Sequence, residues 1–497
     1  MKAILQLILL TLLVPQILNA QLVNDFRVND DTTAYWNINS AVDTDKDGNI
    51  IIVWEDYRRF INGVRIGTNI LCQRYNQNGI PIGENFIINQ FLDSSSVPDL
   101  AVKSDGRFAV TWLLFNNSIS KIAVRLFNKD AIPITADFII NDSAHHLMDQ
   151  PKIVSDKSGG YVITWKIPYK IYSQRIDSLG NRIGSNFIVN EILGNHPVDN
   201  PDITSFTDGR FVITWQDSRP PSLFTNDIYM QRYDSEGNKI GINQRVNDNL
   251  NPEDHQQFPK ISSDTSGRFV IGWTDYNNLS IDSYIQLFNS DGSKQGNNIN
   301  IGGNGDETIR AISKKANGDM IVVYGDGIGF SFPQYCQRFN SQGQFIGSRY
   351  PLSNFPVDYL YTHGVKIYDD RVIATWSDER TGNFDVFCNV RSFTNPDSTV
   401  RINQISSEVP EEYKLYRNYP NPFNPSTNIR FDISKTSDVK LSVYDITGRE
   451  VSVLVNEKLL SGSYEFTFNS TGLSSGVYIY RIKAADFTQT RKMLLVK

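Results

Sequence analysis

The stretch Pro151-Lys-Ile-Val-Ser-Asp-Lys-Ser-Gly-Gly-Tyr-Val-Ile-Thr-Trp165 is the most informative part of the sequence for the fold, because the chain repeats it. A second copy is Pro259-Lys-Ile-Ser-Ser-Asp-Thr-Ser-Gly-Arg-Phe-Val-Ile-Gly-Trp273. Each copy predicts a strand, a turn that contains Gly, and a second strand that ends in Trp. The second strand is rich in β-branched and aromatic residues on both faces, which is typical of a sheet buried between two neighbours.

The terminal tryptophan marks the period of the repeat. Each unit continues with a strand such as Gln73-Arg74-Tyr75, a turn ending in Gly, and a short strand ending in Ile/Val-Asn, such as Val246-Asn247. The marker residues are separated by 58, 53, 50, 58, 51 and 52 residues. They are Trp54, Trp112, Trp165, Trp215, Trp273, Tyr324 and Trp376.

Seven units of four short strands predict an all-β fold in which residues 21–403 form a seven-bladed β-propeller of four-stranded blades. One sheet cannot bury both of its faces alone, so we expect each Trp to pack between blades. A β-helix or a string of sandwiches is the alternative. The strand Phe26–Asn29 is an eighth copy of the closing strand. We expect it to join the last blade and seal the ring, which leaves Arg401–Asn403 as a spare.

The order of the strands distinguishes two faces of the propeller. In an up-and-down blade, the turns between strands one and two and between strands three and four share one face, and here these turns are short, as at Asp208-Gly209. The loops between strands two and three and between blades share the other face, and they are long and varied, as at 216–226. Since function tends to lie on variable loops held by a rigid scaffold, we expect a glycan or protein ligand on this long-loop face.

Three cysteines cannot form a disulfide framework. Cys72, Cys336 and Cys388 occupy one position of the third strand in three consecutive units of the ring. Equivalent strands of neighbouring blades lie about 10 Å apart, whereas a disulfide needs Cα atoms within about 7 Å. We therefore predict three free, buried thiols. The other units place Ala123, Ser173, Met230 and Ile285 at this position in the same alignment.

The first twenty residues resemble a secretory signal peptide. Lys2 is their only charge, an apolar run extends from Ala3 to Leu18, and Asn19-Ala20 precedes a polar segment. We expect cleavage after Ala20, and no other segment is long and apolar enough to predict a transmembrane helix in the mature chain.

After a polar linker at 404–415, the chain changes character at residues 416–497. Alternating strands separated by turns predict a small Ig-like β-sandwich. The segment Asn418-Tyr-Pro-Asn-Pro-Phe-Asn-Pro-Ser-Thr427 opens this part, and Tyr444-Asp-Ile-Thr-Gly448-Arg449 and Leu473-Ser-Ser-Gly476-Val477-Tyr478 follow in order. These motifs resemble the type A C-terminal sorting domain of the type IX secretion system. The residues that carry the resemblance are Asn418, Pro420, Asn421, Pro422, Phe423, Asn424, Pro425, Gly448, Gly476 and Tyr478.

The resemblance implies a protein that crosses the inner membrane with its signal peptide and is then exported by the type IX secretion machinery. Members of the family are usually cut upstream of the domain and are then released or attached to the cell surface. An ordinary Ig-like binding module is the alternative for this part of the chain.

Charge separates the two parts and argues against nucleic acid as a partner. The whole chain has 48 basic and 54 acidic residues, a net charge of −6. Residues 416–497 carry 11 basic and 7 acidic residues, whereas residues 21–415 carry 36 and 47, a net charge of −11. A protein that binds nucleic acid usually presents a basic surface.

The segment Asp43-Thr-Asp45-Lys-Asp47-Gly48 is a candidate calcium site, because alternate carboxylates followed by Gly resemble the start of a calcium loop. The Glu expected at the twelfth position is absent, since Trp54 stands there. Possible Ca²⁺ binding through Asp43, Asp45 and Asp47 and a purely structural polar turn are the two alternatives.

The segments Trp54-Glu-Asp56-Tyr-Arg58, Trp215-Gln-Asp217-Ser-Arg219 and Trp376-Ser-Asp378-Glu-Arg380 place carboxylates on the long-loop face. Two carboxylates can act as acid and base in glycoside hydrolysis. Their recurrence in separate units, each with Arg two residues later, favours a structural turn with a local ion pair. We assign no catalytic residue. The sequence favours a secreted, non-enzymatic binding module, and a secreted glycoside hydrolase or lyase is the alternative.

Overall fold

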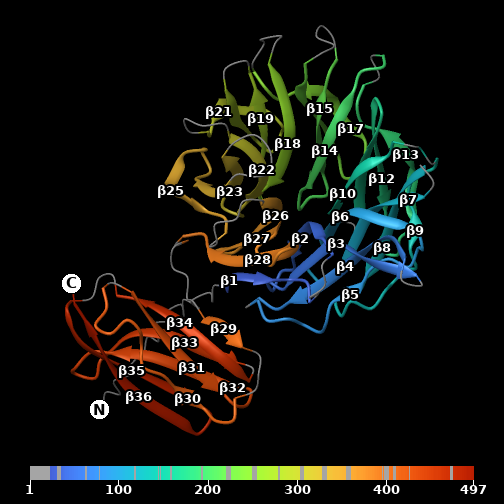
Figure 1. Ribbon diagram of the computed structural model, residues 1–497. Helices are drawn as coiled ribbons and strands as arrows, with labels where there is room; N and C mark the ends of the chain where they lie inside the picture. Colours follow the sequence, from blue (N-terminus) through green and yellow to red (C-terminus); the bar gives the residue numbers. More distant parts are fainter. Residues whose placement is uncertain are drawn as a thin grey trace, which may run out of the picture.

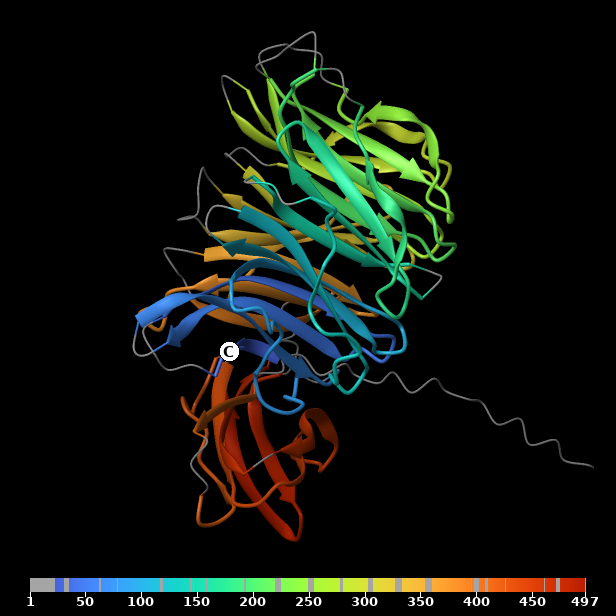
Figure 2. The ribbon, with the colours of Figure 1, turned by 90° about the vertical axis from the view of Figure 1, so that its right-hand side faces the viewer.

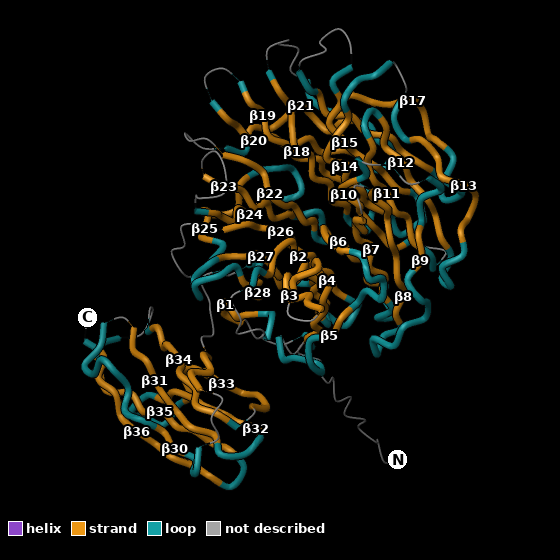
Figure 3. Tube along the Cα trace, turned by 45° about the vertical axis from the view of Figure 1, so that its right-hand side comes forward, coloured by secondary structure: helices purple, strands orange, loops and turns teal. Residues whose placement is uncertain are grey.

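The computed structural model describes residues 23–496 apart from 31–34, 62–63, 78, 117–118, 144, 146, 157–158, 192–193, 220–224, 249–253, 278–279, 303–306, 327–332, 354–359, 395, 397–401, 407–409, 425, 460 and 471–473. The signal peptide expected at 1–20 lies outside these residues. The described elements are all strands (Figure 3). Seven four-stranded antiparallel sheets surround an axis, and two further sheets form a smaller body beside them (Figure 1). The all-β prediction and the seven blades are confirmed.

Blades one to three contain β2 (Asn37–Thr44), β3 (Ile50–Ile61), β4 (Val64–Tyr75), β5 (Phe86–Ile87); β6 (Ser94–Val102), β7 (Phe108–Asn116), β8 (Ile119–Phe127), β9 (Phe138–Ile139); and β10 (Asp149–Ser155), β11 (Tyr161–Ile167), β12 (Lys170–Ile176), β13 (Arg182–Ile188). Blades four to six contain β14 (Val198–Ser205), β15 (Phe211–Asp217), β16 (Asp227–Tyr233), β17 (Lys239–Arg245); β18 (His255–Ser263), β19 (Phe269–Tyr276), β20 (Ile281–Phe288), β21 (Lys294–Asn300); and β22 (Glu307–Lys314), β23 (Met320–Asp326), β24 (Gln334–Phe339), β25 (Phe345–Pro351). Blade seven contains β26 (Leu360–Tyr368), β27 (Arg371–Asp378), β28 (Asp385–Ser392) and β1 (Val23–Arg27).

The N-terminal strand closes the ring, as the sequence predicts. β1 is antiparallel to β28, with Phe26 opposite Cys388. Just beyond this pairing, the Val28 N–H donates to the Val386 carbonyl, and the Val386 N–H donates to the side-chain oxygen of Asn29. Blade seven therefore takes three strands from the end of the propeller and one from its beginning. This strand pairing links the two ends of the ring.

The marker tryptophans pack between blades. All six are at most 1% exposed. Trp112 of blade two lies in one apolar cluster with Val53 and Cys72 of blade one, and Trp54 of blade one lies with Val386 of blade seven. Each sheet thus buries its second face against the preceding blade, which explains why the second strand is apolar on both sides.

The three cysteines are free and buried, which confirms that prediction. Each occupies a different apolar cluster: Cys72 lies with Trp112, Cys336 with Trp376, and Cys388 with Trp54. A tryptophan-filled interface between blades therefore separates each thiol from the next.

One residue in the predicted alignment is wrong. Cys72 is opposite Val53, one residue before Trp54, and the residue in the same register of blade two is Val124, opposite Thr111. Ala123 is predicted at this position only when Arg125 is aligned with Arg74. Arg125 instead occupies the position that Gln holds in five other blades, one residue after the buried side chain that corresponds to Cys72.

A polar clasp joins neighbouring blades at this Gln position. In blade three, the Asn186 amide donates to Gln174 Oε1 at 2.7 Å and to the Ile140 carbonyl of blade two at 3.1 Å, and its oxygen accepts the Asp142 N–H at 2.7 Å. Asn85, Asn243 and Asn298 repeat this arrangement. In blade two, Arg125 and Asp137 replace the Gln-Asn pair, with their charged atoms 3.6 Å apart. Because most buried polar groups in proteins are hydrogen-bonded, we expect this polar clasp to hold neighbouring blades together.

Burial raises the pKa of all three thiols, to about 12 for Cys336. The thiolate is the reactive form, so the folded protein should react very slowly with a thiol reagent at neutral pH. We expect three thiols to be modified in denaturant and none in the native protein. Mass spectrometry after alkylation measures this. Rapid labelling of any one thiol in buffer would contradict its burial between blades.

The smaller body is a sandwich of two sheets, in the orders β29-β34-β31-β30 and β33-β32-β35-β36 (Figures 1 and 2). Its strands are β29 (Ile402–Ser406), β30 (Lys414–Leu415), β31 (Ser426–Ile433), β32 (Ser437–Tyr444), β33 (Glu450–Leu459), β34 (Gly462–Asn469), β35 (Gly476–Ala484) and β36 (Phe487–Leu495).

The strand β29 changes the boundary that the sequence suggested. Residues 401–403 were expected to be a spare strand and 404–415 a linker. In the structure, Ile402 is opposite Phe466 and Gln404 opposite Tyr464, so β29 is an edge strand of the sandwich. Because β1 already fills the fourth position of blade seven, the spare copy pairs with the following domain instead.

Candidate functional site

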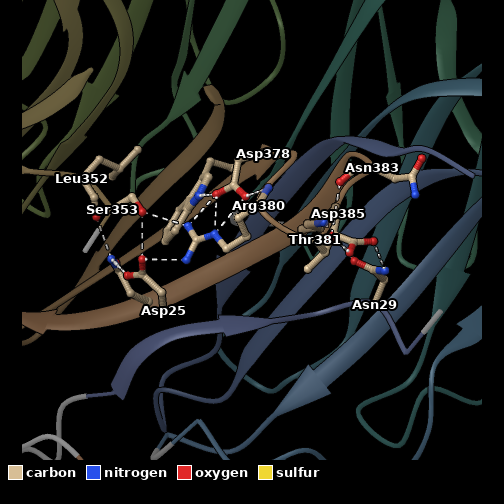
Figure 4. Close-up of polar contacts among 12 residues, drawn as sticks. Asp25, Asn29, Leu352, Ser353, Asp378, Arg380, Thr381, Asn383 and Asp385 are labelled. Atoms are coloured by element: carbon tan, nitrogen blue, oxygen red, sulfur yellow. Dashed lines mark hydrogen bonds and ion pairs between the residues drawn. The ribbon is translucent and has the colours of Figure 1, made fainter. Parts of the chain in front are cut away.

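The Trp-x-Asp-x-Arg segments form buried ion pairs on the long-loop face. In blade seven, Asp378 accepts the indole N–H of Trp376 at 2.8 Å and the Arg380 guanidinium at 2.5 Å (Figure 4). Arg380 also lies 3.2 Å from Asp25 of β1 and stacks over Phe387, 4.0 Å from the ring centroid. The guanidinium therefore ties the closing strand to the blade that it completes.

Blade four repeats this geometry with a different set of partners. Arg219 lies 2.5 Å from Asp217, 3.3 Å from Glu191 of the preceding blade and 3.3 Å from the Asn243 side-chain oxygen. Its guanidinium stacks over Tyr229, 3.8 Å from the ring centroid. A stacked guanidinium with two carboxylates is both desolvated and neutralised.

These contacts decide between the two interpretations of the carboxylates. Asp56, Asp217 and Asp378 are at most 3% exposed, and Arg58 holds Asp56 at 2.6 Å in blade one. A general acid or base must reach the proton that it transfers. Carboxylates buried beneath their own arginine favour the structural turn.

Exposed aromatic side chains gather on the long-loop face. Trp36, in the loop that leads into blade one, is 50% exposed and lies 5.9 Å from Tyr57 and 5.7 Å from Phe384, measured between ring centroids. This cluster could not be predicted from the sequence, because its members come from the loop before β2, from strand β3 and from the loop before β28. Other aromatic residues at or near loops of this face, with at least 36% exposure, are Tyr35, Phe115, Tyr169 and Phe258.

The first strand of each blade lies next to the axis and is called the inner strand below. These inner strands carry charged residues that form pairs between neighbouring blades. Lys366 lies 2.6 Å from Asp43, and Lys152 lies 3.8 Å from Asp99. The Asp99 carboxylate also accepts the Ile153 N–H of the next blade at 2.9 Å. Burial raises the pKa of Asp99 to about 6, and the opposing charge of Lys152 limits the rise. These groups join neighbouring inner strands.

A polar cavity of about 270 Å³, which the sequence does not predict, lies at the tight-turn end of the inner strands. Ser205 donates to the Ser155 carbonyl at 2.7 Å, and Ser263 donates to the Ser205 carbonyl at 3.0 Å. Several of its hydroxyls thus link one blade to the next.

The candidate calcium residues point to different partners. Asp43 pairs with Lys366 at the axis. Asp45 accepts the N–H groups of Asp47 and Asn49, both at 2.9 Å. Asp47 pairs with the neighbouring Lys46 at 2.7 Å. No group of three or more His, Cys, Asp or Glu side chains that could hold a metal ion occurs within the described part of the chain. The contacts favour the polar turn, and calcium binding stays a prediction.

A melting experiment separates the two alternatives. With the turn alone, millimolar Ca²⁺ and EDTA should leave the melting temperature of the mature chain unchanged, because only binding to the folded state raises it. A rise with Ca²⁺ that the double variant Asp45→Asn/Asp47→Asn removes would instead establish a calcium site. That variant preserves the Asp43–Lys366 pair.

The first part of the sorting motif is anchored to the sandwich. Asn418 is 4% exposed, and its backbone N–H donates to the Tyr480 hydroxyl at 2.9 Å. Its side chain donates to Thr427 at 2.9 Å and to the Pro420 carbonyl at 3.2 Å. These contacts fix the direction in which the proline segment leaves the domain.

The centre of the motif pairs with β36, which is an edge strand of its sheet. Phe423 is 2% exposed, its N–H donates to the Leu494 carbonyl, and its carbonyl accepts the Val496 N–H, both at 3.0 Å. Asn421 accepts the Leu494 N–H at 2.9 Å. The peptide bonds that precede Pro420 and Pro422 are cis.

The other motif residues divide into structural and exposed ones. Gly448 has φ of 84° in its turn, which favours glycine, and Tyr478 is 8% exposed and donates to the Ser474 carbonyl at 2.9 Å. Gly476 begins β35, and Pro425 lies outside the described residues. The surface that remains for a partner comprises Tyr419, Pro420, Asn421, Pro422 and Asn424.

Comparison with known families accounts for the C-terminal body. Residues 417–497 match the model of the secretion system C-terminal sorting domain. They are the sorting domain of a type IX secretion substrate, so the protein is secreted or displayed on the cell surface. No curated protein matches the chain in sequence. Within the described residues, no helix is long and apolar enough to cross a membrane.

Solved structures resemble the propeller. An α-L-arabinanase of Penicillium chrysogenum has a TM-score of 0.47 at 11% identity, over 76% of this chain and 99% of its own. An α-L-arabinofuranosidase of Fusarium graminearum has 0.46 at 11%, with the same coverage. A polysaccharide lyase of family PL25, an ulvan lyase, has 0.47 at 8%, over 76% and 99%. At such identities the likeness concerns the fold alone.

Proposed function

We propose that the propeller of this exported protein binds a glycan or a protein on its long-loop face and does not convert it. The exposed aromatic residues of that face carry the proposal, because aromatic rings stack on sugars and anchor protein interfaces. Trp36 is the most exposed of them at 50%. In this proposal residues 1–20 are the signal peptide and the propeller of about 21–403 is the cargo that the sorting domain exports.

A glycan and protein array with the mature chain tests the proposal. Trp36→Ala should weaken binding about tenfold or more, as expected for a central aromatic anchor. Phe345→Ala is the matched control, since Phe345 is 56% exposed but follows a tight turn on the opposite face. Loss of binding in the control alone would place the ligand on the tight-turn face.

A secreted carbohydrate-active enzyme is the second candidate. Asp99 supports it, because a carboxyl group with a pKa of about 6 suits proton transfer near neutral pH. A screen for release of products from polysaccharides separates the two candidates: turnover that Asp99→Asn abolishes would favour the enzyme.

A further inference from the structure

A cavity of about 430 Å³ between blades four and five occupies the position where other blades hold an arginine of their own. The segment Trp273-Thr-Asp275-Tyr-Asn277 follows the Trp-x-Asp-x-Arg pattern, except that Asn277 replaces the arginine. The residues that line the cavity are Asn247, Asp248, Gln256, Trp273, Asp275, Tyr284, Asn297 and Asn298.

The arginine of blade four defines what this position accommodates. The Arg219 side chain is 8% exposed and is surrounded by four groups: a carboxylate at the end of the preceding strand, an aromatic ring, an amide oxygen and an acid from the preceding blade. These groups are Asp217, Tyr229, Asn243 and Glu191.

Register identifies the first two counterparts in blade five. Asp217 is opposite Asp227, and Asp275 is opposite Asp282. Tyr229 stacks on Trp215 at 6.4 Å, and Tyr284 stacks on Trp273 at 6.0 Å. Asp275 and Tyr284 therefore stand in the same register as Asp217 and Tyr229. The Trp273 indole donates to Gln256, whereas the Trp215 indole donates to Asp217.

The polar clasp identifies the other two counterparts. Asn243 binds Gln231 and accepts the Glu191 N–H, both at 2.7 Å. Asn298 binds Gln286 at 2.6 Å and accepts the Asp248 N–H at 2.5 Å. All four counterparts of the groups around Arg219 thus line the cavity of blade five.

The charge and shape of this cavity suit a planar cation. Asp275 is 4% exposed, Asp248 comes from the neighbouring blade, and Lys294 pairs with Asp248 from outside the lining. The Tyr284 ring offers a face on which a guanidinium can stack, as Arg219 does on Tyr229. A lysine ammonium cannot make the same planar contacts with ring and carboxylate.

We infer that this cavity binds a guanidinium group supplied from outside the blade, as an arginine side chain of a partner polypeptide or as free arginine. The site lies on the long-loop face but does not depend on the proposed function, because a small guanidinium compound can enter it whether or not a larger ligand binds elsewhere.

Calorimetric titration of the mature chain with small probes tests the inference. N-acetyl-arginine methylamide should bind, whereas the uncharged citrulline analogue and the lysine analogue should bind at least about tenfold more weakly. Free arginine distinguishes the sources: equal affinity indicates the amino acid itself, and weaker affinity indicates an arginine within a peptide.

Two variants locate the binding. Asp275→Asn should reduce affinity at least about tenfold. Asn277→Arg should abolish binding, because it supplies the blade with its own guanidinium, and it should raise the melting temperature. Asn277→Ser is the matched control and should bind normally. Absence of arginine binding to the wild type, or binding that both Asp275→Asn and Asn277→Arg leave intact, would overturn the inference. Neither result would change the conclusion about a glycan ligand found on the array, so the two proposals can fail independently.

Discussion

Replacing Arg380 by methionine should lower the free energy of unfolding by about 3–5 kcal/mol, the usual cost of removing one partner from a buried ion pair. Methionine retains much of the aliphatic volume, so the change removes mainly the charge. It leaves Asp378 and Asp25, whose side chains are 0% and 1% exposed, without their shared cation. Because Asp25 belongs to β1, the loss falls on the strand that closes the ring. Urea denaturation followed by tryptophan fluorescence measures it.

An exposed Asp-Arg ion pair, with its two residues equally far apart in the sequence, provides the control. Arg107 lies 2.7 Å from Asp105, and the two side chains are 38% and 50% exposed. Arg107→Met should cost about 0–1 kcal/mol, because solvent already screens this pair. Equal losses of unfolding free energy in the two variants would contradict the proposed role of Arg380 in holding β1 to the other strands of blade seven.

Deleting residues 416–497 should leave a folded propeller in the periplasm and remove it from the cell surface and the medium. Every blade is complete without these residues, since β1 supplies the fourth strand of blade seven. Cell fractionation with protease digestion of each fraction measures both location and folding.

The edge strand β29 suggests a matched second truncation. Removing residues 416–497 deprives β29 of its partner β34, whereas truncation after residue 401 removes β29 as well. Both truncated chains should stay in the periplasm, and the shorter one should resist protease at least as well. Wild-type amounts of either chain at the surface would contradict the role of the sorting domain.

The repeat could be predicted because the same physical requirement recurs in every blade. Each second strand is buried on both faces, so Trp165 and Trp273 lie in strands of nearly identical composition. The closing strand at Phe26 was also predictable, because Val28-Asn29 repeats the Ile/Val-Asn pair that follows the outer strand of blades one to four. The positions of the three free thiols follow from the same register.

The sequence was less informative where contacts join distant residues. Arg125 was misaligned because an arginine replaces Gln at a position defined by its partner, Asp137. The Trp36 cluster unites two loops and strand β3, whose order along the chain says nothing about their proximity. The cavity of blade five could not be predicted from the sequence, because groups from two blades line it, among them Asp275 and Asp248.

The mass of the ligand recovered from its complex with the mature chain tests the central proposal most directly. After prolonged incubation, a propeller that only binds should release the ligand with its mass unchanged. Fragments that carry an added water would indicate a hydrolase, and fragments with a new double bond would indicate a lyase. Either product would contradict the proposal that this exported propeller binds without turnover, and its loss in Asp99→Asn would identify Asp99 as required for the reaction.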